Sequence, residues 1–429
     1  SPFTKIAMSR AKSLWKRVKN RLLLSILLFL VTRNVLHSAW VNLWNGSPRS
    51  QQQNFRRRRD IHQQRNAGFS VHSNLDLDIS VPDSDLEAGI PWLLAVAGLL
   101  GLRQLKAAVD GPEEFQLQPG SLQGKNVLIT GGSSGLGLET ATRLAEAGAQ
   151  VLITCRDRAA ENAAEPLQDV AVLTLDLANL QSIHNFVAKC EKLMAGIDVI
   201  ICNAGVMAVP TRCETSDGFE MQLGVNHLGH YALCGHLLPF LGRSDRPTRV
   251  VSVSSLAHRL GNPVRLLQEL DGQANSYNAW AAYSDSKLAN VIFAKELDRR
   301  FKAKGLMASA VSLHPGLCAT DLARYVVSGK DEPLEVTYSK YAAPIQAMLQ
   351  ATRGMLRPIA RGANSHVFLA AGADGGLEQS GGEYFQDMQI AETHPEADDP
   401  ELGLRLWEAS ERLTGVCYDF DAMTCRSFR

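Results

Sequence analysis

The chain has 429 residues, of which 45% are hydrophobic and 21% charged, an ordinary composition for a globular protein. Its net charge is zero, but the 13 Lys and Arg residues before Asp60 have no acidic residue among them. The remainder therefore carries 31 basic residues (44 − 13) against 44 acidic ones. This acidic balance gives no electrostatic basis for binding nucleic acid. The eight cysteines form no CxxC pair, which predicts buried thiols in a reducing compartment and no metal site.

Residues 1–110 are predicted to be a largely disordered targeting leader that precedes one folded domain over residues 111–429. Basic residues followed by the apolar run 22–31 are typical of a signal peptide. The Gln-, Ser- and Arg-rich segment up to about residue 74 resembles a plastid transit peptide, although its basic run also fits a membrane or nucleic-acid patch. A second apolar run, 90–102, is shorter than the roughly 20 residues of a bilayer span, which favours an interfacial anchor.

This order of segments predicts an enzyme that is associated with an organellar membrane. A leader with a signal-like part, a transit-like part and an apolar run resembles those of plastids bounded by extra membranes. We therefore favour a plastid, and the endoplasmic reticulum membrane is the alternative location.

A strand, a glycine-rich turn and a helix are predicted from residue 126 onward. Residues 126–130 are rich in β-formers, and residues 138–147 have helical spacing. Between them, Gly131 permits a tight turn, Gly135 lets the backbone approach a pyrophosphate, and Gly137 lets the helix pack on the strand. The helix N-terminus then offers free N–H groups to the phosphates. The pattern predicts a dinucleotide site in a doubly wound sheet, although glycine turns also arise for structural reasons alone.

The ends of the following strands supply further predicted cofactor contacts. Arg156 follows the second strand, where a basic side chain suits the 2′-phosphate of NADP(H). The adjacent Asp157 would suit NAD, and a solvated loop arginine is the other interpretation. Asp176 and Leu177 end the third strand and are placed to cap an adenine ring. Small residues at 203–205 would let the chain pass beneath a nicotinamide ribose, or they form a simple turn.

A Tyr-x-x-x-Lys pair is predicted to open an amphipathic helix. Tyr283 and Lys287 lie one turn apart on the same face. A free tyrosine has a pKa of about 10, and a nearby ammonium moves that pKa toward neutrality, as general acid–base catalysis requires. Ser255 ends a predicted strand, where its hydroxyl can orient a carbonyl, and Asn226 is a candidate for holding a water beside Lys287. The pair alone is a weak signal; the order of all these motifs strengthens it.

Taken together, the motifs resemble those of the short-chain dehydrogenase/reductase family, and of its retinol-dehydrogenase-like branch in particular. The similarity covers roughly residues 124–415 and includes TGGSSGLG, ICNAGVMAVP, GVNHLGHYAL, VVSVSSLAHRLG, AYSDSKLANVIFAKEL and HPGLCATDL. It implies an α/β fold, a Rossmann-type doubly wound and mostly parallel seven-stranded sheet with helices on both faces. It also implies a substrate lid at about residues 321–360 and pairing into a homodimer.

The resemblance implies roles for single residues as well. Tyr283 would be the acid/base, Lys287 its pKa-lowering partner, Ser255 the residue that orients the carbonyl, and Asn226 the support of a proton relay. The residues implied to line an NADP(H) site are Gly131, Ser133, Ser134, Gly135, Leu136, Gly137, Arg156, Asp176, Leu177, Asn203, Ala204, Gly205, Tyr283, Lys287, Pro315, Gly316 and Thr320. The histidines at 227, 230 and 236 are interpreted as packing or surface residues and not as ligands.

The function that these features predict is interconversion of a lipophilic carbonyl, such as a retinal-like or lipid aldehyde or ketone, with its alcohol. The apolar lid segment suits such a substrate, but equally an ordinary packed helix pair. Two alternatives stay open: an NADP(H)-binding redox sensor or scaffold subunit of a membrane complex, and a pigment-pathway reductase of the protochlorophyllide type. The light-dependent reductases resemble the chain less, because YSDSKLAN lacks the Cys that they carry after the Lys.

Overall fold

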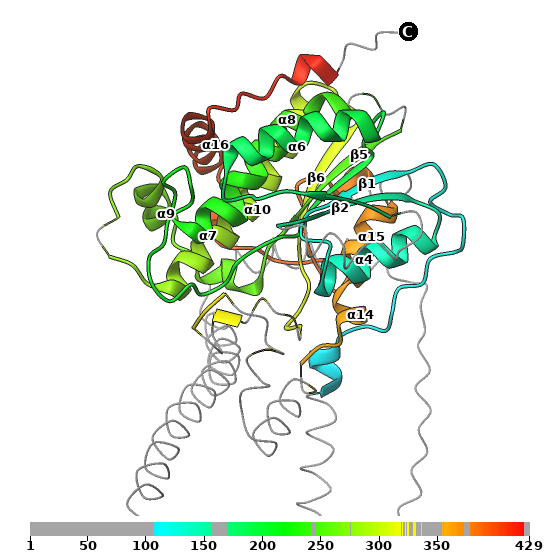
Figure 1. Ribbon diagram of the computed structural model, residues 1–429. Helices are drawn as coiled ribbons and strands as arrows, with labels where there is room; N and C mark the ends of the chain where they lie inside the picture. The colour runs from blue at the N-terminus through cyan, green and yellow to red at the C-terminus, as the bar shows by residue number, and fades with distance from the viewer. Residues whose placement is uncertain are drawn as a thin grey trace, which may run out of the picture. The chain divides into compact units, whose positions relative to one another are not determined.

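A twisted sheet lies at the centre of the part of the chain that this computed structural model describes (Figure 1). Described are residues 106–156, 170–241, 246–274, 276–318, 356–372 and 378–423, together with isolated positions at 243 and from 320 to 354. The strands, in chain order, are β1 Asn126–Ile129, β2 Gln150–Cys155, β3 Val170–Thr174, β4 Val199–Cys202, β5 Thr248–Val253, β6 Ala308–His314, β7 Tyr384–Gln386 and β8 Gln389–Ile390.

The strand order β3-β2-β1-β4-β5-β6-β7-β8 confirms the predicted doubly wound sheet. Strands β1 to β7 pair in parallel, and the order reverses between β1 and β4, which is where such sheets bind ligands. The described sheet has one strand more than the seven predicted. The two-residue β8 folds back antiparallel on β7, and so short a strand leaves no periodicity in a sequence.

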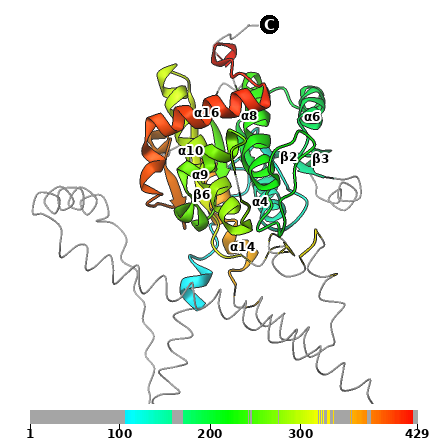
Figure 2. The same ribbon diagram turned by 90° about the vertical axis from the view of Figure 1, so that its left-hand side faces the viewer.

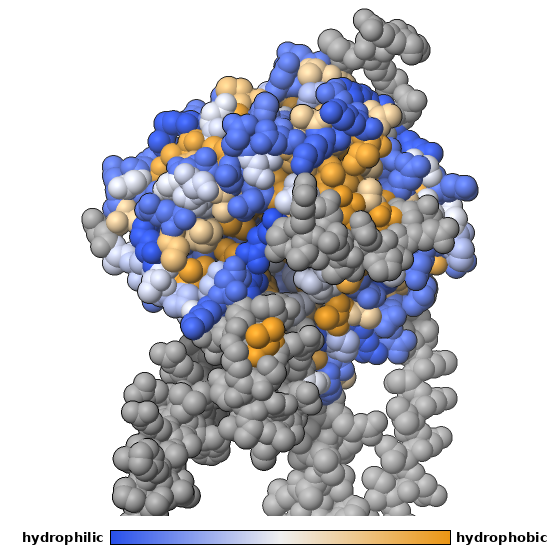
Figure 3. Space-filling view, in the orientation of Figure 1, coloured by the Kyte–Doolittle hydropathy of each residue, from blue (hydrophilic) through white to orange (hydrophobic). Residues whose placement is uncertain are grey.

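Helices cover both faces of the sheet, as predicted (Figures 1 and 2). On one face lie α4 Gly135–Glu146, α14 Ile359–Gly362 and α15 Asn364–Ala371; on the other lie α6 Leu180–Leu193, α8 Gly229–Leu241, α10 Ala279–Ala303 and α16 Pro400–Thr414. Alternate strand residues enter the two cores: Leu128 faces the α6 side, whereas Val127 and Ile129 face the α4 side. On the face seen in Figure 3, hydrophilic residues predominate around the rim.

The helix that carries the Tyr-x-x-x-Lys pair differs from the prediction in two ways. It begins four residues earlier, at Ala279, because the side chain of Asn278 accepts hydrogen bonds from the backbone of Trp280 and Ala281 at the N-cap. Its first half is also not amphipathic, since residues 283–294 are all buried. This half of α10 lies between β5 and β6 on one side and α7 Met221–Leu223, α9 Pro263–Leu270 and α16 on the others, so every face is covered.

The prediction of buried cysteines is wrong for two of them. Cys213 and Cys417 are exposed, and Cys318 is half-buried. The other described cysteines are buried and free: Cys155, Cys190, Cys202 and Cys234.

The predicted leader lies almost wholly outside the described residues. Residues 106–110 form a helix beside α14 (Figure 2), and Val109 accepts a hydrogen bond from Arg357 at 2.9 Å. Within the described ranges, no helix combines the length and apolarity needed to span a bilayer. The boundary between residues 110 and 111 therefore stays a prediction. The helix at 106–110, which precedes this boundary, is already attached to the folded domain through Arg357.

Asn364 fastens residues 113–115 to the body. Its side-chain oxygen accepts from the backbone of Phe115 at 2.9 Å, and its amide donates to the carbonyl of Glu113 at 2.7 Å. Asn364→Ala is expected to lower the free energy of unfolding by about 1–3 kcal/mol, because these backbone groups lose their partners. Chemical denaturation measures the change. The control Asn185→Ala, on the exposed side of α6, is expected to stay within about 0.5 kcal/mol of the wild type; an equal effect of the two variants would contradict the attachment.

Candidate active site

The glycine turn after β1 is as tightly packed as its sequence predicts. Gly131 has a φ of +63°, a left-handed conformation that favours glycine. A Cβ at Gly137 would lie 2.3 Å from the carbonyl oxygen of Gly131 and 2.7 Å from the side-chain nitrogen of Asn203. Only glycine at position 137 lets α4 start this close to the end of β1.

The start of α4 has the features of an anion site. Ser134 is its N-cap residue, and among the described residues its side chain caps none of the free N–H groups of the first turn. A Cβ at Gly135 would lie 3.4 Å from the methyl group of Thr320, so the structure brings two predicted cofactor residues together. Ser133 is half-buried beside them, and Leu136 packs against Gly362 of α14. Open N–H groups at this helix end fit a pyrophosphate.

One threonine hydroxyl organises the loop after β4. The Thr130 hydroxyl accepts from the backbone of Asn203 at 2.9 Å and of Ala204 at 3.0 Å. The Nε2 atom of His230 lies 2.8 Å from it, and Nδ1 lies 3.0 Å from the carbonyl of Asn226. Because a carbonyl only accepts, Nδ1 carries the proton and Nε2 accepts from Thr130. Burial lowers the pKa of His230 to about 4, so it is a neutral packing residue that joins this loop to Asn226.

Asn226 lies in a π-helical turn, Gly224–Leu228, immediately before α8. Its side-chain oxygen accepts from the backbone of Val206 at 2.8 Å, and its amide donates to the carbonyl of Val206 and to the hydroxyl of Ser286. The side chain therefore positions the loop at Gly205–Val206. The predicted water would instead have to bind the backbone carbonyl of Asn226, which keeps a second lone pair besides the one that His230 uses.

The structure brings the predicted catalytic side chains together at the C-terminal end of β5. The side chains of Tyr283 and Ser255 lie within interaction range of each other, and the Lys287 ammonium lies 5.8 Å from the centre of the tyrosine ring. The ammonium donates to the carbonyl of Val253 at 3.0 Å. A Cβ on Gly205 would lie 3.5 Å from the Lys287 nitrogen, so the loop after β4 closes on the same point.

The electrostatics of this group differ from the prediction. Burial raises the pKa of Tyr283 to about 12, and the hydrogen bond from Ser255 offsets only part of the rise. Burial also lowers the pKa of Lys287 to about 8. In the protein alone the tyrosine is thus a protonated acid, because desolvation dominates its pKa.

Three other predicted cofactor residues lie at the same edge of the sheet, but their side chains contact other parts of the protein. The carboxylate of Asp176 accepts from the backbone of Ala178 at 2.9 Å, so it holds its own turn. The side chain of Leu177 is buried in the core on the α6 side, which leaves only its backbone for a cofactor. Arg156 is exposed, and its guanidinium donates to Asp331 at 2.8 Å. The predicted lid, about residues 321–360, otherwise lies mostly outside the described residues.

Arg357 is a residue that no sequence motif indicated. Its side chain is buried, and it donates to the carbonyl of Pro315 at 3.1 Å and to the carboxylate of Asp387 at 2.6 Å. A Cβ at Gly316 would lie 2.5 Å from the guanidinium carbon, and one at Gly111 would lie 2.3 Å from a terminal nitrogen. The guanidinium thus lies between two glycines and fixes the loop that carries Pro315 and Gly316.

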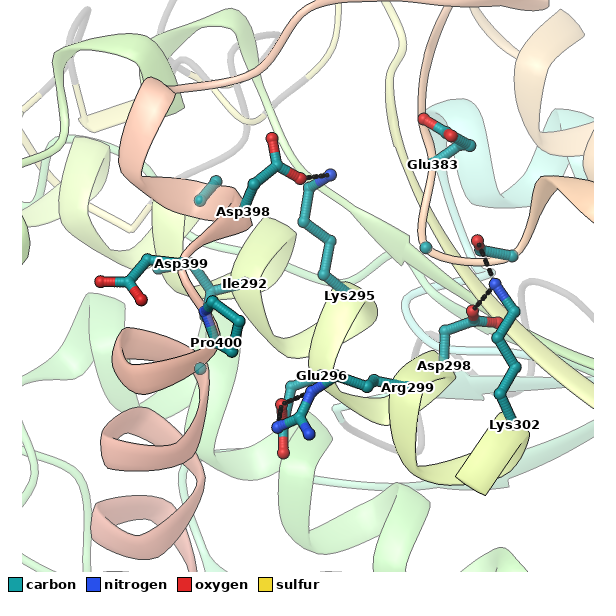
Figure 4. A pocket seen from close by; sticks show the side chains of 14 residues that line it. Ile292, Lys295, Glu296, Asp298, Arg299, Lys302, Glu383, Asp398, Asp399 and Pro400 are labelled. Carbon is teal, nitrogen blue, oxygen red and sulfur yellow. Dashed lines mark hydrogen bonds and ion pairs between the residues drawn. The ribbon is translucent and has the colours of Figure 1, made fainter. Parts of the chain in front are cut away.

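A separate pocket lies along the second half of α10, beside the start of α16 (Figure 4). Its charges are paired within the pocket: Lys295 with Asp398 at 2.6 Å, and Lys302 with Asp298 at 2.7 Å. None of the predicted site residues line it. The first of these ion pairs fastens α10 to the segment before α16, and the second lies within α10.

A glycine turn at the switch point of a doubly wound sheet, with a Ser-Tyr-Lys group beside it, defines a dinucleotide-dependent oxidoreductase. Comparisons with known proteins agree. Residues 125–267 match the family model for short chain dehydrogenase. The chain is 38% identical to human (Homo sapiens) retinol dehydrogenase 13 over 305 residues, which is 69% of this chain and 86% of that protein. It is 36% identical to mouse (Mus musculus) retinol dehydrogenase 14 over 348 residues, 76% of this chain and 96% of that protein.

Among solved structures, an uncharacterized protein of Mycobacterium paratuberculosis is similar, with 33% identity, a TM-score of 0.55, and coverage of 71% of this chain and 99% of that one. The chain therefore belongs to the short-chain dehydrogenase/reductase family, in its retinol-dehydrogenase-like branch. It is an oxidoreductase that acts on alcohols or carbonyls with a nicotinamide cofactor.

Proposed function

We propose that the protein interconverts a lipophilic carbonyl and its alcohol with NADP(H), and that Tyr283 transfers the proton. The observation that carries the proposal is the cluster of Tyr283, Ser255 and Lys287 at the end of β5, in which Tyr283 and Lys287 are buried. When bound, the nicotinamide supplies or accepts the hydride. The residues that would hold the cofactor are those of the glycine turn, the first turn of α4 and the loop at Pro315–Gly316.

In this proposal each of the three side chains has a distinct task. The Ser255 hydroxyl orients the carbonyl oxygen of the substrate, and the phenol of Tyr283 donates its proton to that oxygen during reduction. In the oxidation direction the phenolate of Tyr283 has to accept the proton, and the raised pKa of about 12 opposes this direction because it keeps the side chain protonated. The ammonium of Lys287 stabilises the phenolate that is left after reduction. Burial of Tyr283 and Lys287 limits the access of water to the proton transfer.

The preference for NADP(H) rests on Arg156, at the end of β2. A guanidinium there can bind a 2′-phosphate with two charge-assisted hydrogen bonds. Arg156→Gln is expected to weaken NADPH binding about 10- to 100-fold and to leave NADH binding nearly unchanged, because one charge-assisted contact to the phosphate is lost. Fluorescence titration measures both affinities.

Arg412→Gln is the matched control. Arg412 is an exposed arginine on α16 that pairs with Asp271 at 2.9 Å, so it resembles Arg156 in exposure and partner but lies outside the site. Equal weakening of NADH and NADPH in Arg156→Gln would contradict the assignment of this arginine to the 2′-phosphate.

The proposed substrate is a lipophilic aldehyde or ketone, or the corresponding alcohol. Support comes from the apolar residues of the predicted lid and from the names of the similar proteins, which are retinol dehydrogenases. The test is NADPH oxidation with retinal, long-chain aldehydes and quinones. NADPH binding without turnover of any of them would favour the redox sensor or scaffold function instead.

We also propose that the apolar run at residues 90–102 holds the enzyme at a membrane. The run ends four residues before the helix at 106–110, which is attached to the body next to the Pro315–Gly316 loop. Cosedimentation of the full chain with vesicles, compared with a chain that begins at residue 106, tests this association. The organelle, whether plastid or endoplasmic reticulum, is a separate question for imaging of the tagged full chain.

A further inference from the structure

The carboxylate of Asp331 lies between two arginines from different parts of the chain. Arg156 follows β2 and donates to one carboxylate oxygen at 2.8 Å. Arg324 donates through its Nε atom to the other oxygen. Asp331 and Arg324 both belong to the segment after β6, whereas Arg156 is about 170 residues earlier in the chain. One small oxyanion thus joins two guanidinium groups.

We propose that Arg156 and Arg324 together form the site for the 2′-phosphate of NADP(H), and that Asp331 occupies this site as an internal competitor when no cofactor is bound. The inference rests on the proposed preference for NADP(H). It adds a second phosphate-binding residue, Arg324, and a residue that lowers cofactor affinity, Asp331. Both a carboxylate and a phosphate monoester offer oxygens that guanidinium groups bind as pairs of hydrogen bonds.

The two arginines differ in their exposure to water. The side chain of Arg156 is 62% exposed, so water can solvate its charge when a partner leaves. That of Arg324 is only 12% exposed, and its guanidinium also lies 5.2 Å from the centre of the Tyr325 ring. Exchange of Asp331 for a phosphate keeps an anion beside this enclosed cation.

The ionisation of Asp331 suits it to compete. Partial burial alone would raise the pKa of its carboxyl, but the hydrogen bond from Arg156 and the charges of both arginines outweigh burial and hold the pKa below its usual range. Asp331 is therefore an anion at neutral pH. A phosphate monoester carries about −1.5 to −2 charges at the same pH. It therefore binds the two arginines more tightly than the singly charged carboxylate and displaces it. NADH has no 2′-phosphate, so the exchange gives it no advantage.

The test uses the full chain with NADPH, NADH and the probe 2′-AMP, whose affinities are measured by calorimetry. Asp331→Asn keeps the shape of the side chain but removes the competing charge. We expect it to bind NADPH and 2′-AMP about 5- to 10-fold more tightly and NADH with unchanged affinity. Arg324→Gln is expected to weaken NADPH and 2′-AMP about 10- to 100-fold while NADH changes less than about threefold.

Two controls distinguish a specific effect on the phosphate site from a general effect of charge or folding. Asp271→Asn removes an exposed carboxylate that pairs with an arginine on α16 and should change none of the affinities. Melting curves of every variant show whether Arg324→Gln is folded, and Asp331→Asn tests the proposal independently of that variant.

The outcomes are distinguishable from failure of the proposed function. If the wild type prefers NADPH and loses the preference in Arg156→Gln, but Arg324→Gln and Asp331→Asn bind as the wild type does, the two-arginine site is overturned and the NADP(H) preference stands. Weaker NADPH binding in Asp331→Asn would likewise overturn the competitor role, since it would show that the carboxylate only supports the fold. A wild type that binds NADH and NADPH equally would overturn both.

Discussion

Tyr283→Phe is expected to lower kcat by about two to four orders of magnitude, the contribution typical of a positioned general acid or base. The phenol is buried beside Ser255, with the Lys287 ammonium 5.8 Å from its ring, and phenylalanine keeps that packing while removing the only proton that the tyrosine side chain can transfer. NADPH affinity is expected to change less than threefold, because the substitution removes one hydroxyl and leaves the glycine turn intact. Steady-state kinetics and fluorescence titration measure the two effects.

A half-buried tyrosine outside the site provides the control for this substitution. The hydroxyl of Tyr418 donates to the carbonyl of Tyr231 at 2.7 Å, so Tyr418→Phe also removes one hydroxyl hydrogen bond. It should lower stability slightly and leave kcat unchanged. Similar kcat losses in both variants would show that Tyr283 acts through folding and not as the proton donor.

Arg357→Met is expected to lower the free energy of unfolding by about 3–5 kcal/mol, the cost of breaking a buried ion pair by removing one partner. The substitution leaves the Asp387 carboxylate and the carbonyls of Val109 and Pro315 without their donor. Because the loop at Pro315–Gly316 is one of the predicted cofactor contacts, the KM for NADPH should rise as well. Denaturant unfolding and steady-state kinetics measure the two consequences.

Two further variants test whether the loss of stability in Arg357→Met comes from the missing guanidinium contacts. Arg357→Lys keeps the charge but not the forked geometry, so it should recover part of the stability and little of the KM. Arg405→Met changes an exposed arginine of α16 and is expected to shift stability by less than about 0.5 kcal/mol. A stable Arg357→Met variant with a normal KM would contradict the role of this arginine in fixing the loop.

The parts of the fold that depend on local pattern could be predicted from the sequence. The apolar run before Gly131 and the helical spacing after Gly137 placed β1 and α4 within a few residues, because turn chemistry and periodicity are local. The strand ends likewise located Ser255, and the helix spacing put Tyr283 and Lys287 on one face. Each of these inferences needs only neighbouring residues.

What could not be predicted depends on contacts between distant segments. Arg357 belongs to no recognisable sequence motif. Its role depends on Val109, Pro315 and Asp387, which are distant in the chain and lie beside it in the fold. The amphipathic assignment of α10 failed because covering elements enclose the helix from several sides. The raised pKa of Tyr283 has the same origin, since desolvation is a property of the packed structure. The pairing of Arg156 with Asp331 also spans about 170 residues of chain.

The central claim is that this protein reduces a lipophilic carbonyl with NADPH by proton transfer from Tyr283. The most direct measurement mixes the full chain with NADPH and retinal and follows NADPH consumption together with the alcohol formed, for the wild type and for Tyr283→Phe. We predict one alcohol per NADPH consumed in the wild type and a loss of at least 100-fold in the variant, in line with the typical contribution of a general acid. Equal NADPH oxidation by the two proteins, or alcohol formation without NADPH, would contradict the account.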